Sequence, residues 1–386
     1  MNELTNRRRE WLLFAALLLP LCILRFSLNS GSGPYGVDGS YYAQIARNVA
    51  EGRGLVTNVC LYHQGLDPLP APTNIYPLWP MLLGTTARLI GFTEAMRHLP
   101  RVLYLLAVIA LYIAARRVTG EQRIIGPFTV AHLAAVIFGL TPVFFSSTTF
   151  PYTEGLAFLL ACAALALAFQ QGAAAALIGG IAAGLATLTR SQMLMLVVAV
   201  ILARALAAVR DKRWTDLLLT MVGASLVLVP WIFYVSTLTG TFAWTNLTAS
   251  YVQTPAIPPY PFAMQTADST AMVRLKGLGT AFNPASPNSF FALFGPVVLL
   301  VPIAAAHWVY RAFKARPRLS AGVLAFVLSG AFLCFVLALV PMRFFREWLF
   351  GWRHGLPLIF LIVPALVELF AFGHRAVRGA ALLIAV

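Results

Sequence analysis

Residues 37–54 read VDGSYYAQIARNVAEGRG and form a polar segment that closely follows the first apolar segment of an otherwise apolar chain. At the helical period its apolar residues gather on one side, namely Tyr41, Tyr42, Ile45, Ala46 and Val49. Its polar residues fall on the other side, namely Gln44, Arg47, Asn48 and Glu51. Gly52 and Gly54 then favour the end of a helix. The segment is therefore predicted to be a short amphipathic helix.

This helix is expected to lie in the headgroup plane of a membrane. It is amphipathic, it adjoins an apolar span, and it carries tyrosines on its apolar side. Asp38 then stands at the start of the helix, at the boundary between water and lipid. Because Asp is also a favoured helix N-cap, a purely structural role for Asp38 stays open at this point.

The composition is that of an integral membrane protein. Of the 386 residues, 60% are hydrophobic and 11% are charged, and the mean hydropathy is +0.80. The net charge of +15 does not indicate a nucleic-acid partner, because the arginines lie in short clusters between apolar segments and follow the positive-inside rule. Arg far outnumbers Lys and Ala is abundant, a compositional hint of a GC-rich bacterial genome.

The apolar segments predict an all-α polytopic bundle with ten complete transmembrane helices. The predicted spans are 11–28, 101–115, 127–145, 152–169, 174–188, 193–208, 217–235, 290–310, 323–341 and 356–372. Residues 380–386 begin a partial eleventh span, so the chain is expected to be truncated at its C-terminus. Residues 1–386 are expected to form a single membrane domain.

The arginine clusters predict the orientation of this bundle. With the N-terminus in the cytoplasm, nearly every even-numbered span ends in a basic cluster, and the uncharged link at 170–172 is the exception. The two long loops, 29–100 and 236–288, then lie on the outer face. Within the first loop, residues 75–92 are apolar but interrupted by prolines and too short to span comfortably. They are expected to be interfacial or re-entrant.

Ionisable residues inside the predicted spans are few. Arg25 lies near the outer end of its span, where an arginine can snorkel to the interface, and Glu368 lies within reach of the inner surface. His132 is expected to be hydrogen-bonded within the bundle. Because no file of acids and histidines crosses the midplane, an ion-coupled transporter is not favoured.

The outer face, in contrast, gathers acids and arginines at one depth. Asp38, Glu154, Arg190 and the pair Arg353-His354 all fall there. An arginine fork binds phosphate and stabilises it as a leaving group. A carboxylate can remove a proton from an incoming hydroxyl. These residue types at one membrane face indicate an enzyme that acts on a lipid phosphate.

The segment from Asp38 to Gly54 resembles the first outer loop of GT-C glycosyltransferases, in particular the group of protein O-mannosyltransferases and lipid A aminoarabinose transferases. Further similar features follow in the same order: Tyr76-Pro77-Leu78 with Arg101 after it, Thr141-Pro142 before Glu154, GLATLTR at 184–190, and Arg353-His354-Gly355-Leu356-Pro357. Together they cover most of the chain. The chain departs from many relatives at Gly39, where a second acid often follows the first.

The resemblance implies an inverting enzyme that moves a sugar from a polyprenyl-phosphate donor to an acceptor hydroxyl on a glycolipid, polysaccharide or protein. It implies a place in the bacterial cytoplasmic membrane with the active site on the periplasmic side. In the family the acid of this loop is the general base, which assigns that role to Asp38. The donor phosphate is predicted to bind at Arg190, Arg353 and His354 on the outer face, with supporting roles for Glu154, Tyr41, Tyr42 and Tyr76.

Two other interpretations stay open. A transporter or flippase of lipid-linked sugars would need charged or broken helices at mid-depth. A non-catalytic subunit with the same fold is compatible with Gly39 in place of an acid. No metal site is predicted, because His63, Asp67 and His98 lack the spacing of metal ligands. The resemblance leaves open whether the enzyme needs a divalent metal.

Overall fold

The computed structural model describes residues 2–27, 36–58, 70–73, 77–120, 122–149, 151–168, 170–239, 291, 294–315, 321–339, 353–373 and 375–385. Within these ranges the chain is mostly helical, and two short antiparallel hairpins are the exception. Most of the predicted outer loop 236–288 lies outside the described residues.

The first part of the chain contains α1 (Asn2–Ser27), α2 (Gly36–Ala50), β1 (Val56–Thr57), β2 (Ala71–Pro72), α3 (Leu78–Ile90), α4 (Phe92–Thr119), β3 (Arg123–Ile125), β4 (Phe128–Thr129), α5 (Val130–Leu140), α6 (Pro142–Ser147) and α7 (Glu154–Ala168). The rest contains α8 (Ala173–Thr189), η1 (Ser191–Met193), α9 (Leu194–Asp211), α10 (Trp214–Thr239), η2 (Gly295–Leu299), α14 (Leu300–Ala315), α15 (Ala321–Leu339), η4 (Arg353–Leu358), α16 (Ile359–Phe372) and α17 (Arg375–Ala385), where η denotes a 3₁₀ helix.

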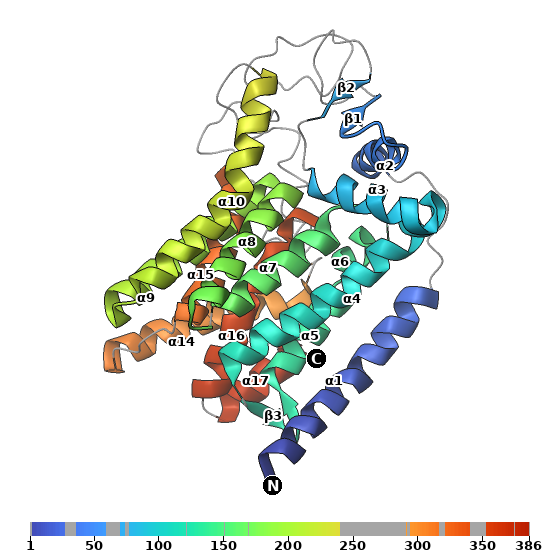
Figure 1. Cartoon of the computed structure of the whole chain (residues 1–386). Coiled ribbons are helices and arrows are strands. Elements are labelled where there is room, and N and C mark those ends of the chain that lie inside the picture. The colour runs from blue at the N-terminus through green and yellow to red at the C-terminus, as the bar shows by residue number, and fades with distance from the viewer. Residues whose placement is uncertain are drawn as a thin grey trace.

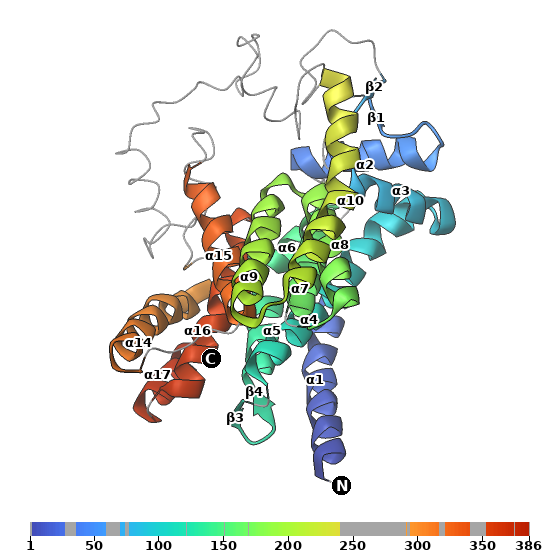
Figure 2. The same cartoon turned by 60° about the vertical axis from the view of Figure 1, so that its left-hand side comes forward.

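The helices pack side by side into one bundle, and α2 and α3 lie across one end of it (Figure 1). Figure 2 shows the same end from another side, with β1 and β2 beside α2 and the upper part of α10. The N-terminus and the β3–β4 hairpin lie at the opposite end. We refer to these ends as the α2–α3 end and the N-terminal end.

The predicted amphipathic helix is confirmed as α2, and it ends before Gly52 and Gly54, whose φ angles are +82° and +83°. Its apolar side is buried, with Ile45 fully covered. One residue of the expected polar side is placed differently. Asn48 is only 1% exposed, because it donates a hydrogen bond of 2.8 Å to the carbonyl of Val56 at the start of β1. The hairpin covers a surface that the sequence pattern assigned to water.

The helices α2 and α3 pack in very close contact. A Cβ atom on Gly84 of α3 would lie 2.5 Å from the carbonyl oxygen of Ala46 and 2.7 Å from Cβ of Val49. Arg88 of α3 donates from Nε to the carbonyl of Ala50 at 3.0 Å, satisfying a carbonyl at the end of α2. Glycine is therefore required where the two helices meet, and α3 holds α2 in place.

We expect Gly84→Ala to lower the free energy of unfolding by about 1–3 kcal/mol, because the added methyl group meets backbone that cannot move aside easily. Thermal unfolding of the purified protein in detergent measures this. Gly379→Ala in α17 is the matched control, since nothing lies within 4 Å of a Cβ atom there. Equal unfolding temperatures for the two variants would contradict the close packing of α2 on α3.

The predicted span 127–145 is wrong as a single helix. Gly126, with a φ of +52°, allows a hairpin between β3 and β4, and α5 then begins at Val130. The helix breaks at Thr141, which has a ψ of 115°, before α6 starts at Pro142. A residue before proline is driven towards extended conformations by clash with the proline ring, which accounts for the break.

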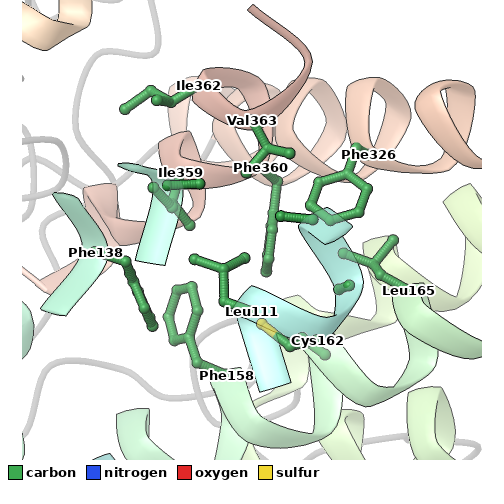
Figure 3. Packing of buried hydrophobic residues seen from close by; sticks show 14 of the residues in the cluster. Leu111, Phe138, Phe158, Cys162, Leu165, Phe326, Ile359, Phe360, Ile362 and Val363 are labelled. Atoms are coloured by element: carbon green, nitrogen blue, oxygen red, sulfur yellow. The ribbon is translucent and has the colours of Figure 1, made fainter. Parts of the chain in front are cut away.

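The core joins helices that are far apart in the sequence. Phe158 of α7 packs against Phe360 of α16 at 5.5 Å between ring centroids, and Phe138 of α5 lies 5.4 Å from Phe158. Phe326 of α15 meets the far side of Phe360. Figure 3 shows these rings pointing towards one another around Leu111 and Cys162. The packing fixes α5, α7, α15 and α16 against one another.

Three helical segments among the described residues are long and apolar enough to cross a membrane: Arg8–Ser27, Phe92–Thr119 and Trp214–Leu238. The second is longer than the predicted span 101–115, because α4 starts directly after Gly91. Many apolar side chains on α1 and α10 are exposed, as expected for lipid-facing helices. The protein is a multi-pass membrane protein, and the count of ten spans stays a prediction.

Candidate active site

A buried ion pair joins the start of α7 to the end of α8 at the α2–α3 end. Arg190 donates from Nη1 to Oε1 of Glu154 and, at 3.3 Å, to Oγ1 of Thr153. Glu154 is 1% exposed and Arg190 is 8% exposed. A charge-assisted contact of this kind is strong once both groups are out of water. Each buried charge is then stabilised by the opposite charge of its partner.

Local sequence explains why the two side chains face each other. Glu154 is in the first turn of α7, where the N-terminal partial charge of a helix favours an acid. Arg190 directly follows α8, with its N–H bonded to Ala186 and an extended backbone that turns the chain into η1. The neighbouring helices α7 and α8 run antiparallel, so the start of one lies beside the end of the other.

A tryptophan connects α3 to the turn that carries the acid. Trp79 is fully buried, and its Nε1 donates to the carbonyl of Pro151 at 2.7 Å. Because α3 also packs on α2, the helix of Asp38 and the Glu154–Arg190 pair belong to one connected structure at the α2–α3 end. No motif in the sequence marks Trp79 as part of the site, although a buried indole needs a partner for its N–H.

Asp38 lies in the first turn of α2 with a half-buried side chain. Since α2 begins at Gly36, Asp38 is inside the helix and does not occupy the N-cap position. Its carboxylate nevertheless benefits from the positive end of the helix dipole. An electrostatic role at the start of α2 therefore stays open for Asp38 beside the catalytic role.

Tyr41 and Tyr42 are both buried, with their rings 6.3 Å apart in an edge-to-face arrangement. The hydroxyl of Tyr41 lies 3.4 Å from Oγ1 of Thr73, directly after β2. Burial raises the pKa of the Tyr41 phenol above its ordinary value, because the phenolate would be poorly solvated there. Tyr234 of α10 donates to the carbonyl of Thr73 at 3.4 Å. Thr73 therefore links α2 to α10.

Arg25 does not snorkel to the interface as predicted. Its side chain is fully buried and donates to the carbonyl of Thr148, with the guanidinium 5.1 Å from the ring of Phe145. Arg101 is also buried, 5.7 Å from the ring of Phe26. The Arg25 side chain is covered although its neighbours Leu24 and Phe26 on α1 are exposed, so its guanidinium contacts a protein carbonyl and an aromatic face in place of water.

The other predicted ionisable residues have partners within the bundle. The prediction for His132 is confirmed, because Nδ1 lies 2.7 Å from Oγ1 of Thr129 and Nε2 lies 3.1 Å from the carbonyl of Glu10. Glu368 accepts from Arg311 at 2.6 and 2.7 Å and lies 2.8 Å from Nδ1 of His307. His98 is a residue of α4, not of a loop, and it contacts Glu94.

Several predicted residues are placed only in part. Tyr76, His63 and Asp67 lie outside the described residues. Arg353 and His354 begin η4, whose backbone contacts α6, and their side chains are not described. Among the described residues, no three His, Cys, Asp or Glu side chains gather as metal ligands would.

No protein-family model matches the chain, and no curated protein matches its sequence. Solved structures do match it. A crystal structure of ArnT from Cupriavidus metallidurans bound to undecaprenyl phosphate has a TM-score of 0.60 and 18% identity, over 96% of this chain and 62% of that chain. The Archaeoglobus fulgidus oligosaccharyltransferase in the apo form has a TM-score of 0.59 and 14% identity, over 96% of this chain and 54% of that chain.

A third structure, Archaeoglobus fulgidus AglB in complex with an inhibitory peptide and a dolichol-phosphate, has a TM-score of 0.53 and 15% identity, over 98% of this chain and 54% of that chain. The chain thus spans roughly half to three-fifths of the length of the structures it matches. ArnT and AglB are both GT-C glycosyltransferases, and the similarity covers nearly the whole of this chain. The resemblance that the outer-loop sequence indicates is confirmed, and this chain has the GT-C fold.

Proposed function

We propose that the protein is an inverting glycosyltransferase that takes a sugar from a polyprenyl-phosphate donor and transfers it to an acceptor hydroxyl. The observation that carries the proposal is the convergence of the Asp38 helix and the buried Glu154–Arg190 pair at one end of a GT-C fold. The undecaprenyl phosphate bound to ArnT and the dolichol-phosphate bound to AglB support the donor class.

In the proposed mechanism Asp38 is the general base. Its carboxylate takes the proton from the acceptor hydroxyl as the hydroxyl oxygen forms a bond to the anomeric carbon. The bond from that carbon to the donor phosphate oxygen breaks at the opposite face, and the electron pair leaves with the polyprenyl phosphate. A single displacement inverts the anomeric centre and needs no second carboxylate as nucleophile, so Gly39 is compatible with catalysis.

The arginine is proposed to stabilise the leaving phosphate. Arg190, together with Arg353 and His354, would supply charge-assisted hydrogen bonds to its oxygens. Glu154 holds the guanidinium of Arg190 at the end of α8, so that the cation is oriented before the donor arrives. Because the guanidinium is already oriented, little reorganisation is needed during transfer. Such preorganisation is the main source of electrostatic catalysis.

The acceptor class is a glycolipid, a polysaccharide or a protein. The proposed place is the bacterial cytoplasmic membrane, with the α2–α3 end on the periplasmic side. An outer location is supported by the arginine clusters of the sequence, which favour the cytoplasm for the N-terminal end.

The decisive experiment is transfer by the purified protein, using a panel of polyprenyl-phosphate sugars with cell-envelope fractions as acceptors. We expect one donor to be consumed, free polyprenyl phosphate to be released, and the product to have the inverted anomeric configuration by NMR. Donor binding without release of polyprenyl phosphate would favour a non-catalytic subunit. Movement of intact donor across vesicles without transfer would favour a flippase.

A further inference from the structure

A cavity of about 180 Å³ lies far from the proposed active site, among the α7–α8 link, the end of α9, the start of α10 and the start of α15. Figure 1 shows the turn between α9 and α10 at the side of the bundle away from α2 and α3. The polar lining comes from three arginines, two aspartates and two glutamines: Arg204, Arg210, Arg213, Asp211, Asp216 and the pair Gln170-Gln171. The lining carries one net positive charge.

Arg204 forms the buried wall of this cavity. It is 6% exposed, and its Nη2 donates to the carbonyls of Leu167 at 3.0 Å and Gln170 at 2.9 Å. Its Nη1 lies 3.7 Å from Asp216, too far for a strong hydrogen bond, and its Nε makes none among the described residues. The guanidinium is thus held rigidly by backbone, while its charge is only partly neutralised.

Of the two other arginines that line the cavity, Arg210 is exposed and Arg213 is half-buried. Arg213 donates to Oε1 of Gln171 at 2.6 Å, and Arg210 is paired with its neighbour Asp211 at 2.8 Å. The link at 170–172 is the predicted exception to the positive-inside rule, because it carries no charge of its own. In the structure, arginines from α9 and from the α9–α10 turn lie beside this uncharged link.

Apolar side chains run along the helices directly beside the cavity. Leu202, Leu206 and Val209 are exposed along one face of α9, and Trp214 and Leu218 are exposed at the start of α10. A ligand that suits both surfaces has a phosphate for the arginines and acyl chains for these side chains. Tryptophan at this position is typical of the headgroup level of a bilayer.

We propose that this cavity binds the phosphate of an anionic phospholipid from the leaflet at the N-terminal end of the bundle. The phosphodiester carries one negative charge, which matches the net charge of the lining. Basic pockets between membrane helices are suited to anionic headgroups for this reason. The bound lipid would fasten α9 and α10 to the α7–α8 link. It would thereby stabilise the packing of α7 and α8, the two helices whose other ends carry Glu154 and Arg190.

The test compares the thermal unfolding of the full chain in neutral detergent with added phosphatidylglycerol, phosphatidylcholine of the same acyl chains, or inorganic phosphate. We expect phosphatidylglycerol alone to raise the unfolding temperature, and native mass spectrometry to retain one such lipid per chain. Equal effects of the two lipids would overturn the proposal. An equal effect of inorganic phosphate would assign the cavity to a free anion and overturn the lipid as occupant.

Arg213→Gln is the variant of choice, because the residue lines the cavity, is only half-buried and is not part of the proposed catalytic machinery. Loss of one charge-assisted contact should weaken phosphatidylglycerol binding about tenfold or more. Arg123→Gln on β3 removes an exposed charge elsewhere at the N-terminal end and serves as the matched control. Unchanged lipid binding in Arg213→Gln, or an equal loss in Arg123→Gln, would overturn the site. Neither result depends on sugar transfer, so it leaves the proposed function untouched.

Discussion

Sugar transfer by Asp38→Asn is expected to fall at least a hundredfold, while the unfolding temperature stays close to that of the unchanged protein. One positioned general base typically contributes about 10²–10⁴-fold to a rate. Asn keeps the size and hydrogen-bonding ability of Asp but cannot accept the proton of the acceptor hydroxyl. Because Asp38 lies in the first turn of α2, the expected loss on replacement by Asn is its interaction with the helix dipole, typically about 0.3–1 kcal/mol, so the unfolding temperature should change little.

The measurement is release of polyprenyl phosphate under single-turnover conditions, together with thermal unfolding of the same preparation. Glu94→Gln in α4 is the control, since Glu94 is an exposed acid that pairs with Arg97 and His98 on its own helix. It should transfer sugar at the unchanged rate. Near-normal transfer by Asp38→Asn would remove Asp38 from the mechanism and leave it as a helix residue only.

The second large effect is expected for the Glu154–Arg190 pair. Breaking a buried pair by removing one partner leaves an uncompensated charge and typically costs about 3–5 kcal/mol. Arg190→Met and Glu154→Gln should each destabilise the protein by an amount of this order, as measured by thermal unfolding. Both residues are nearly inaccessible to water, so solvent can replace neither partner.

The double variant Glu154→Gln with Arg190→Met separates structure from function. It removes both charges, so it should be more stable than the sum of the two single losses implies. Sugar transfer should not recover, because the cation proposed for the donor phosphate is still missing. Loss of one such contact weakens donor binding by roughly ten- to a hundredfold. A stable double variant with normal transfer would make the pair a purely structural contact between α7 and α8.

Local sequence patterns were enough to predict the individual elements and the class of fold. Alternation of apolar and polar residues predicted α2, and the two glycines after it predicted its end. Apolar segments predicted most of the helices of the bundle, and the loop from Asp38 to Gly54 predicted the GT-C fold that the comparisons show. These features are local: a helix is set by hydrogen bonds and contacts within about four residues along the chain.

Which side chains meet depends on how the helices pack, and could not be predicted from the sequence. Glu154 and Arg190 are 36 positions apart, and Trp79 reaches a carbonyl 72 positions away. Burial of Arg25 and of Asn48 likewise depends on segments that come to cover them from elsewhere in the chain. No periodic pattern encodes such contacts, because they arise when separate helices pack and exclude water from groups that are polar in the sequence. A buried polar group without a hydrogen bond costs free energy, so the packing must also bring a polar partner to each such group.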